Sequence, residues 1–245
     1  MAIDFSLSPD LEAIRARVRG FIDEVVRPTE QRIDDGRLRD TDKRAYYGEL
    51  LGMRAAARGA GLWLPHMPAE WGGMGLGHVE LAMVQAEAAK SSFGPWVLNC
   101  QAPDEGNMHT LLHWGTDAQK EKYLRPLCEG TAMSCFAMTE PEVAGSDPTL
   151  IRTTGYQDGD EWVISGHKWF ISNAHRATFA ILIVRTEDNP DIPQAANTAF
   201  IVDLPSDGWT EVRQIETMHG GTGHSEIPIE DLRVPADQML GGRGQ

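Results

Sequence analysis

The sequence predicts an α+β protein, in which an all-α N-terminal domain (residues 1–131) is followed by an antiparallel, β-barrel-like domain (residues 132–245). Up to Gly130, apolar residues recur every three or four positions, as on one face of a helix. After Gly130, short strand-like runs are separated by turn residues. The composition agrees, because 41% apolar and 24% charged residues are normal for a globular chain of 245 residues.

The helical part begins with a clear start signal. Ser8 followed by Pro9 suits the cap and first turn of a helix, and apolar residues between 11 and 25 mark its buried face. Pro28 is expected to bend or end this helix, because proline lacks the backbone N–H. The later helices are expected at about residues 41–58, 78–90, 107–114 and 118–128, the last one capped by Thr116 or Asp117, with a Pro- and Gly-rich loop over 64–77.

The second part consists of short runs separated by turn chemistry. Asp158-Gly159-Asp160 has the composition of a hairpin tip. No internal repeat or coiled coil is visible. Strands are expected at residues 133–139, 162–165, 168–173, 179–184 and 199–202.

Charge and cysteine content exclude several classes of protein. A net charge of −14, from 36 acidic and 22 basic residues, opposes a general nucleic-acid or anionic-membrane surface. The N-terminal stretch has no signal-peptide core and no apolar run is long enough to span a bilayer, so we expect a cytoplasmic protein. Cys100, Cys128 and Cys135 form an odd set without CxxC, so buried free thiols are expected.

Two patterns that can mark ligand sites do not predict one here, because the surrounding residues do not fit. The glycines of residues 73–77 follow a loop rather than a strand, so they do not predict a dinucleotide-binding turn. His109 and His113 are four residues apart on an expected helix, but the zincin glutamate and a third ligand are missing. We therefore expect surface or capped histidines there and predict no metal site.

The segment over residues 135–147, CFAMTEPEVAGSD, carries the first functional signal. A strand is expected to end at Thr139, and a loop to begin at Pro141. Gly145 and Ser146 let the backbone approach a ligand and offer N–H and hydroxyl donors, which suit a heterocycle edge or a phosphate. An ordinary strand–loop connection is the alternative interpretation.

The segment over residues 166–173, GHKWFISN, carries the second signal. Alternation along a strand predicts Phe170 and Ser172 on one face and Trp169 and Ile171 on the other. An aromatic ring beside a hydroxyl suits a flat, polar-edged ring system. The alternative is a half-buried strand with Phe170 in the core.

Together the two segments resemble the acyl-CoA dehydrogenase family. The first is similar to the family signature, a Thr/Ser-Glu-Pro loop followed by Gly-Ser-Asp, and the second to the flavin-contacting strand after it. Other stretches match in order: residues 64–75 resemble a Gly-rich family loop, 115–124 the helix before the signature, and 229–235 the strand that closes the β domain. The resemblance covers essentially the whole chain.

The resemblance implies FAD as cofactor and a set of residues that bind it. Ser146 is also implied to lie near the acyl-CoA, and Ser172 near flavin N5. Glu140 is interpreted as a structural acceptor, and no catalytic residue is nominated, because the family's glutamate base belongs to a helical C-terminal domain that is absent here. The implied cofactor-binding residues are Phe136, Met138, Thr139, Gly145, Ser146, Phe170 and Ser172.

The sequence departs from the commonest family form in one loop. Residues 139–145 are one residue longer, and together with residues 103–108 they resemble a subgroup that also occurs fused to kinase-like domains. That subgroup handles longer or hydroxylated acyl-CoAs, so the acyl chain is left open.

The function implied is FAD-dependent α,β-desaturation of fatty acyl-CoA thioesters. Implied partners are the acyl-CoA substrate, an electron-transfer flavoprotein and, at full length, further copies of the chain in a homo-oligomer. Two alternatives stay open. One is a non-catalytic half-subunit that completes a flavin site with a helical partner chain, and the other is an acyl-CoA oxidase or other flavin oxidase, which would form hydrogen peroxide rapidly.

Overall fold

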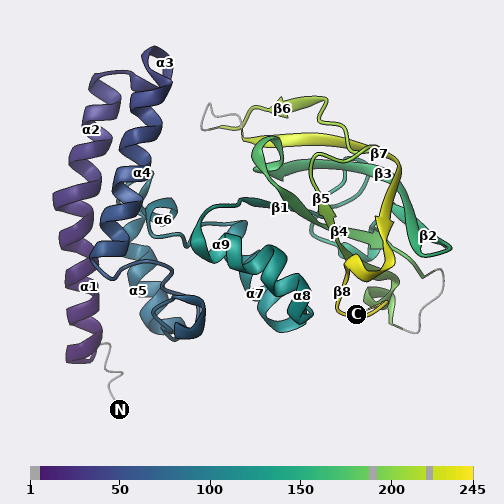
Figure 1. The fold of residues 1–245 in the computed structure, drawn as a ribbon, viewed down its shortest axis with the longest axis horizontal. Coiled ribbons are helices and arrows are strands. Elements are labelled where there is room, and N and C mark those ends of the chain that lie inside the picture. Colours follow the sequence, from purple (N-terminus) through teal and green to yellow (C-terminus); the bar gives the residue numbers. More distant parts are fainter. Residues whose placement is uncertain (1–5, 188–191, 219–222, 245) are drawn as a thin grey trace. The chain divides into compact units, whose positions relative to one another are not determined.

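The computed structural model describes residues 6–187, 192–218 and 223–244. Contacts divide the chain into two compact units, one up to Glu105 and one from Gly106 onward. The first unit is helical, and the second combines helices with a sheet (Figure 1). The predicted fold class, a helical N-terminal region followed by a mostly antiparallel β domain, is confirmed. Within the described ranges, no helix has both the length and the apolarity needed to cross a membrane.

The first unit begins with one long helical run. The side chain of Ser8 accepts a hydrogen bond from the Leu11 N–H at 3.3 Å and caps α1 (Pro9–Phe21). A single π-helical turn leads from α1 into α2 (Arg27–Asp35), so Pro28 does not end the helix. Pro28 lies in the first turn of α2, where a missing N–H is tolerated. The unit continues with α3 (Leu38–Thr41), α4 (Lys43–Gly59), α5 (His78–Ala88) and α6 (Gly94–Val97).

An apolar core and one buried carboxylate hold the first unit together. Glu87 on α5 is 5% exposed and accepts hydrogen bonds from Arg19 on α1, from Nε at 3.1 Å and Nη2 at 2.7 Å. Lys90 also pairs with Glu87. Because a buried carboxylate is costly without donors, these contacts fix α1 against α5. The core includes Val18, Ile22, Leu50, Met53 and Val84.

The second unit starts with helices. It contains α7 (Asp104–Trp114) from Gly106 onward, α8 (Asp117–Gln119) and α9 (Arg125–Glu129). Thr116 caps α8 in a reciprocal capping box with Gln119. Of the two cap residues that the sequence predicts, Thr116 and Asp117, the structure thus uses Thr116. Gln119 Nε2 also donates to the carbonyl oxygens of Asp237 and Met239, at 2.9 and 3.1 Å. The predicted domain boundary at residues 131/132 lies between α9 and the first strand, within this unit, and stays a prediction.

The sheet of the second unit is mixed but mostly antiparallel. Its strands follow the order β6-β7-β3-β2-β4-β5-β8, and β1 pairs with β4. The pairs β1–β4 and β2–β4 are parallel, which the sequence does not predict. The strands are β1 (Ser134–Ala137), β2 (Thr154–Asp158), β3 (Glu161–Ser172), β4 (Phe179–Arg185), β5 (Asn197–Asp203), β6 (Arg213–Ile215), β7 (His224–Pro235) and β8 (Met239–Leu240).

β3 is the strand that positions the candidate site. The predicted hairpin tip is confirmed, because Asp158 pairs with Glu161 and Gly159 has φ of 65°. The two runs predicted over 162–165 and 168–173 form this single strand, which pairs with β7. Lys168 pairs with Ile227 and Ile171 with Ser225, so three steps on β3 oppose two on β7. β3 therefore carries a β-bulge at residues 169–170.

Candidate functional site

The signature segment begins inside the sheet and emerges at its end. Cys135 and Ala137 on β1 are buried, whereas Phe136 between them is half-buried. β1 pairs with β4 only up to Ala137. Met138 and Thr139 follow it and are half-buried. All three predicted site residues of this segment therefore keep some accessible surface.

Two hydrogen bonds join the end of this segment to β3. Trp169 donates its backbone N–H to the Thr139 carbonyl oxygen at 3.0 Å. Lys168 donates from Nζ to the Met138 carbonyl oxygen at 2.9 Å. Both donors directly precede Phe170, so the structure brings Met138 and Thr139 together with the bulge of β3.

A buried ion pair strengthens this junction. Lys168 is 0% exposed and Glu140 is 2% exposed, and Nζ lies 2.8 Å from Glu140 Oε1. The same carboxylate accepts hydrogen bonds from the Arg152 N–H at 2.7 Å, the Thr153 N–H at 2.9 Å and the Thr153 hydroxyl at 2.6 Å. Glu140 is thus satisfied entirely by protein donors.

The charge environment agrees with a structural role for Glu140. Burial alone would raise the pKa of its carboxyl, but the Lys168 ammonium and the Thr153 donors outweigh burial and hold this pKa below its usual value. A general base needs a free lone pair within reach of substrate and a pKa near the working pH. The carboxylate of Glu140 thus accepts structural hydrogen bonds, as the sequence predicts, and the expectation that it is not the catalytic base stays a prediction.

Phe170 lies on the surface of the bulge. Its backbone has φ of 53° and its side chain is 42% exposed. The interpretation that places Phe170 in the core is therefore wrong. Strict alternation from Trp169 to Ser172 is also wrong, because the extra residue interrupts the pleat between Lys168 and Ile171.

Ser172 lies close to Phe170 through a residue of the neighbouring strand. Ser172 pairs with His224 on β7, and Ser172 Oγ is 2.8 Å from His224 Nδ1. The rings of Phe170 and His224 have centroids 6.5 Å apart. Phe170 is exposed and Ser172 and His224 are partly exposed, and we call these three residues the Phe170 cluster.

The signature loop places its two predicted residues differently. A Cβ added to Gly145 would lie 2.9 Å from Thr139 Cγ2, so a side chain at this position would press on Thr139. Ser146 lies on the exposed part of the loop. Asp147 turns the chain back by accepting from the Thr149 N–H at 3.0 Å. Gly145 therefore packs closely against the side chain of Thr139. That Ser146 lies near the acyl-CoA stays a prediction.

Sequence reasoning missed two members of this site. Lys168 lies in a strand-like run with aromatic and apolar residues. A lysine buried in such a strand needs an acidic partner, so its position in this run could have indicated a buried ion pair. His224 gives no such signal, since its partnership with Ser172 depends on the register between β3 and β7.

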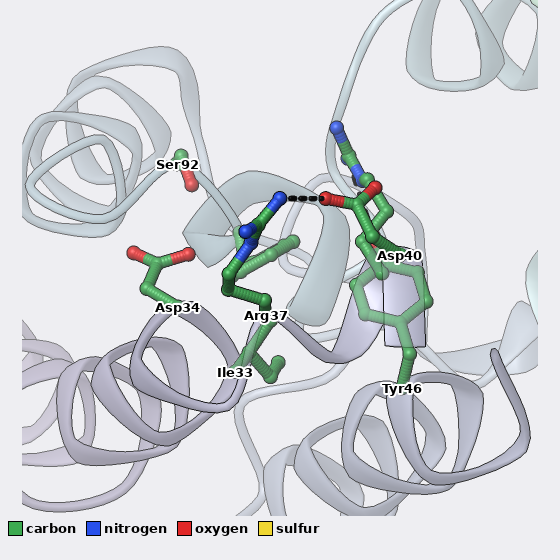
Figure 2. A pocket seen from close by; sticks show the side chains of 8 residues that line it. Ile33, Asp34, Arg37, Asp40, Tyr46 and Ser92 are labelled. Atoms are coloured by element: carbon green, nitrogen blue, oxygen red, sulfur yellow. Dashed lines mark hydrogen bonds and ion pairs between the residues drawn. The ribbon is translucent and has the colours of Figure 1, made fainter. Parts of the chain in front are cut away.

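A separate pocket of about 460 Å³ lies in the first unit and contains none of the predicted site residues. Both arginines of its lining are paired within it: Arg37 forms an ion pair with Asp40 (Figure 2), at 3.5 Å, and Arg39 donates to the Tyr46 hydroxyl at 3.3 Å. This mutual pairing indicates no ligand class.

Family models match nearly the whole chain. The model of the acyl-CoA dehydrogenase N-terminal domain matches residues 8–131, and that of the middle domain matches residues 135–232. The histidine and lysine of the site described above, His224 and Lys168, both lie within the matched middle domain.

Several known proteins are similar to the chain over nearly all of its length. Human acyl-CoA dehydrogenase family member 11 is 33% identical over 245 residues, which are 96% of this chain and 31% of that protein. FadE2 of Mycobacterium tuberculosis, described as an acyl-CoA dehydrogenase, is 36% identical over 99% of this chain and 60% of its own length. A solved structure from Mycobacterium abscessus, also described as an acyl-CoA dehydrogenase, has a TM-score of 0.87 and 34% identity, and the match covers 98% of this chain and 62% of that one.

The chain therefore spans less than two thirds of these relatives. The fold alone is also shared with a glutaryl-CoA dehydrogenase from Mycobacterium smegmatis in complex with FADH2, with a TM-score of 0.71 and 23% identity. The family is one of flavoprotein oxidoreductases that bind FAD, act on acyl-CoA and form oligomers. With both domain models matched in order and relatives above 30% identity, this chain belongs to the acyl-CoA dehydrogenase family and represents its N-terminal and middle domains.

Proposed function

We propose that the chain is part of a FAD-dependent enzyme that desaturates fatty acyl-CoA thioesters between the α and β carbons. The observation that carries the proposal is the Phe170 cluster, held beside Met138 and Thr139 by the hydrogen bonds of Lys168 and Trp169. This surface combines an exposed aromatic ring with hydroxyl groups, which is the chemistry that a flavin ring needs.

The residues present fit an isoalloxazine ring. Phe170 offers an apolar contact, and the hydroxyls of Ser172 and Thr139 can bond to a polar ring edge. A Cβ added to Gly223, next to His224, would meet no atom of the described residues within 4 Å. Phe136 and Met138 add partly accessible apolar surface from the signature segment.

Positioning is the contribution of this chain to the reaction. FAD supplies the redox step when it is bound. The buried Glu140–Lys168 pair fixes Met138 against β3, and the bulge holds Phe170 outward, so the binding surface is formed before the ligand arrives. The apolar ring of Phe170 would exclude water from the face of the bound ring.

The remaining features of the proposal follow from the family. We propose that Ser146 lies near the acyl-CoA and that electrons pass to an electron-transfer flavoprotein. We also propose a homo-oligomer in the cytoplasm. The net charge of −14 supports a protein that binds neither nucleic acid nor anionic membranes.

Flavin spectroscopy tests the proposal. The protein that carries this chain is purified with added FAD, and its visible spectrum is recorded anaerobically before and after each of a panel of acyl-CoAs. The expected result is a yellow protein whose flavin absorbance bleaches with at least one fatty acyl-CoA. A protein that stays colourless in excess FAD contradicts the proposal.

The same samples separate the two alternatives. Rapid peroxide formation when air is admitted to the reduced protein would identify an oxidase. Flavin binding that appears only after a helical partner chain is added would identify a half-subunit.

A further inference from the structure

The hydrogen bond between Ser172 and His224 can run in either direction. Ser172 Oγ and His224 Nδ1 are 2.8 Å apart. A neutral imidazole has one N–H, and serine has one O–H. If Nδ1 carries the hydrogen, it donates to Oγ, and the serine proton is available to a ligand. If Nδ1 carries none, serine donates to it and can only accept from a ligand.

The backbone holds this pair in register. Ser172 and His224 are direct partners in the antiparallel ladder of β3 and β7. Next to them, the Asn173 N–H donates to the Gly223 carbonyl oxygen at 2.9 Å. The His224 ring also lies 6.5 Å from the Phe170 ring, centroid to centroid, and both Ser172 and His224 are partly exposed.

We propose that His224 is a positioning residue that sets the hydrogen-bonding direction of Ser172 toward the flavin. The inference rests on the proposed function, since it requires the Phe170 cluster to receive the ring. The pair can face an acceptor, as oxidised flavin presents at N5, or a donor, as reduced flavin presents there, by reversing one hydrogen bond. The tautomer of His224 changes in this reversal. One ring nitrogen releases a proton to solvent and the other takes one up, so the charge of the imidazole does not change.

Nitrogen NMR of ¹⁵N-histidine-labelled protein tests the tautomer directly. With oxidised FAD, the expected spectrum shows the hydrogen on Nδ1 of His224, and with chemically reduced FAD it shows the hydrogen on Nε2. In the Ser172→Ala variant, the tautomer should no longer follow the redox state. A single unchanged tautomer in both redox states overturns the inference.

Flavin absorbance of the same samples distinguishes a failure of the proposed function from a failure of the inference about His224. If FAD does not bind, the proposed function fails, and the inference falls with it. If FAD binds normally but the His224 tautomer does not respond, only the inference fails.

The reduction potential of the bound flavin gives a second readout. His224→Phe should change the relative affinity for reduced and oxidised FAD about ten-fold, equivalent to about 30 mV for a two-electron couple. The shift should disappear in the Ser172→Ala background, because His224 acts through that hydroxyl. His113→Phe, an exposed histidine on α7 of the same unit, is the matched control and should leave the potential unchanged.

A variant that keeps the polar contact guards against misfolding. His224→Asn retains a group that can donate or accept near the Nδ1 position, so its potential should lie closer to the unmodified protein than that of His224→Phe. Equal potentials for the folded His224→Phe and unmodified proteins contradict the inference.

Discussion

Lys168 is a fully buried cation whose Nζ lies 2.8 Å from Glu140 Oε1 and 2.9 Å from the Met138 carbonyl oxygen. Replacing it by methionine preserves much of its volume but leaves the Glu140 carboxylate buried without its counter-charge. We expect Lys168→Met to lower the free energy of unfolding by about 3–5 kcal/mol, measured by chemical denaturation.

An exposed ion pair provides the control. Lys122 lies 2.8 Å from Asp203 Oδ2, and its side chain is 53% exposed. Lys122→Met should change the free energy of unfolding by less than about 1 kcal/mol, as is usual for surface pairs. Equal losses for the two variants would show that burial of the Lys168 pair does not matter.

The ion-paired carboxylate of Glu87 should make the free energy of unfolding of the helical unit depend on pH. Hydrogen bonds from Arg19 lower the pKa of the Glu87 carboxyl from its ordinary 4.5 to about 2. Because the folded pKa is depressed, the stabilisation is present above pH 4.5 and is lost as the pH falls towards 2. Glu87→Gln should therefore be less stable than the unmodified protein at pH 7, and the difference should shrink steadily between pH 4.5 and 2.

Denaturant titrations over this pH range make the measurement. The exposed Glu24 of the same helical unit is the control, and Glu24→Gln should track the unmodified protein at each pH. A Glu87→Gln difference that stays constant down to pH 2 would contradict the ion-pair account.

At the scale of elements, the sequence predicts features that depend on neighbouring residues, but not features that depend on how two strands pair. The cap at Ser8 and the hairpin tip at residues 158–160 are set by nearby residues, so the sequence predicts them. The bulge at Phe170 arises because β7 supplies one residue fewer than β3 over that stretch. Neither strand alone contains this information, which is why the alternation argument fails there.

The approach of β3 to Thr153 can be tested through Gly166. A Cβ at this position would lie 2.3 Å from Thr153 Oγ1 and 2.6 Å from Thr153 Cα. Thr153 supplies two of the donors to Glu140, so the displacement would also disturb the buried pair. We expect Gly166→Ala to reduce the free energy of unfolding by about 1–3 kcal/mol in thermal or chemical denaturation.

A glycine with open surroundings gives the matched comparison. A Cβ added to Gly106 on α7 meets nothing within 4 Å. Gly106→Ala should be neutral or stabilise by about 0.5–1 kcal/mol, because alanine favours a helix interior. Destabilisation by Gly106→Ala as large as that by Gly166→Ala would contradict the steric explanation.

At the scale of the whole molecule, family resemblance and folding physics contribute different parts of the site. Hydrophobic periodicity and turn residues predict the α+β class, whereas the resemblance of the ordered motifs nominates Phe170 and Ser172 as flavin contacts. The structure adds Lys168 and His224, whose roles depend on partners that are 28 and 52 residues away in sequence. Such long-range contacts have no local signature.

The central claim is that the Phe170 cluster receives the flavin. An FAD titration followed by flavin fluorescence, on the protein that carries this chain, tests it most directly. Removing the exposed ring in Phe170→Ala should weaken FAD binding about ten-fold or more, since burial of a phenyl side chain contributes about 1.5–3 kcal/mol. Tyr156→Ala, which removes a 64% exposed ring on β2, should leave the affinity unchanged. Equal FAD affinity in Phe170→Ala and the unmodified protein would contradict the account.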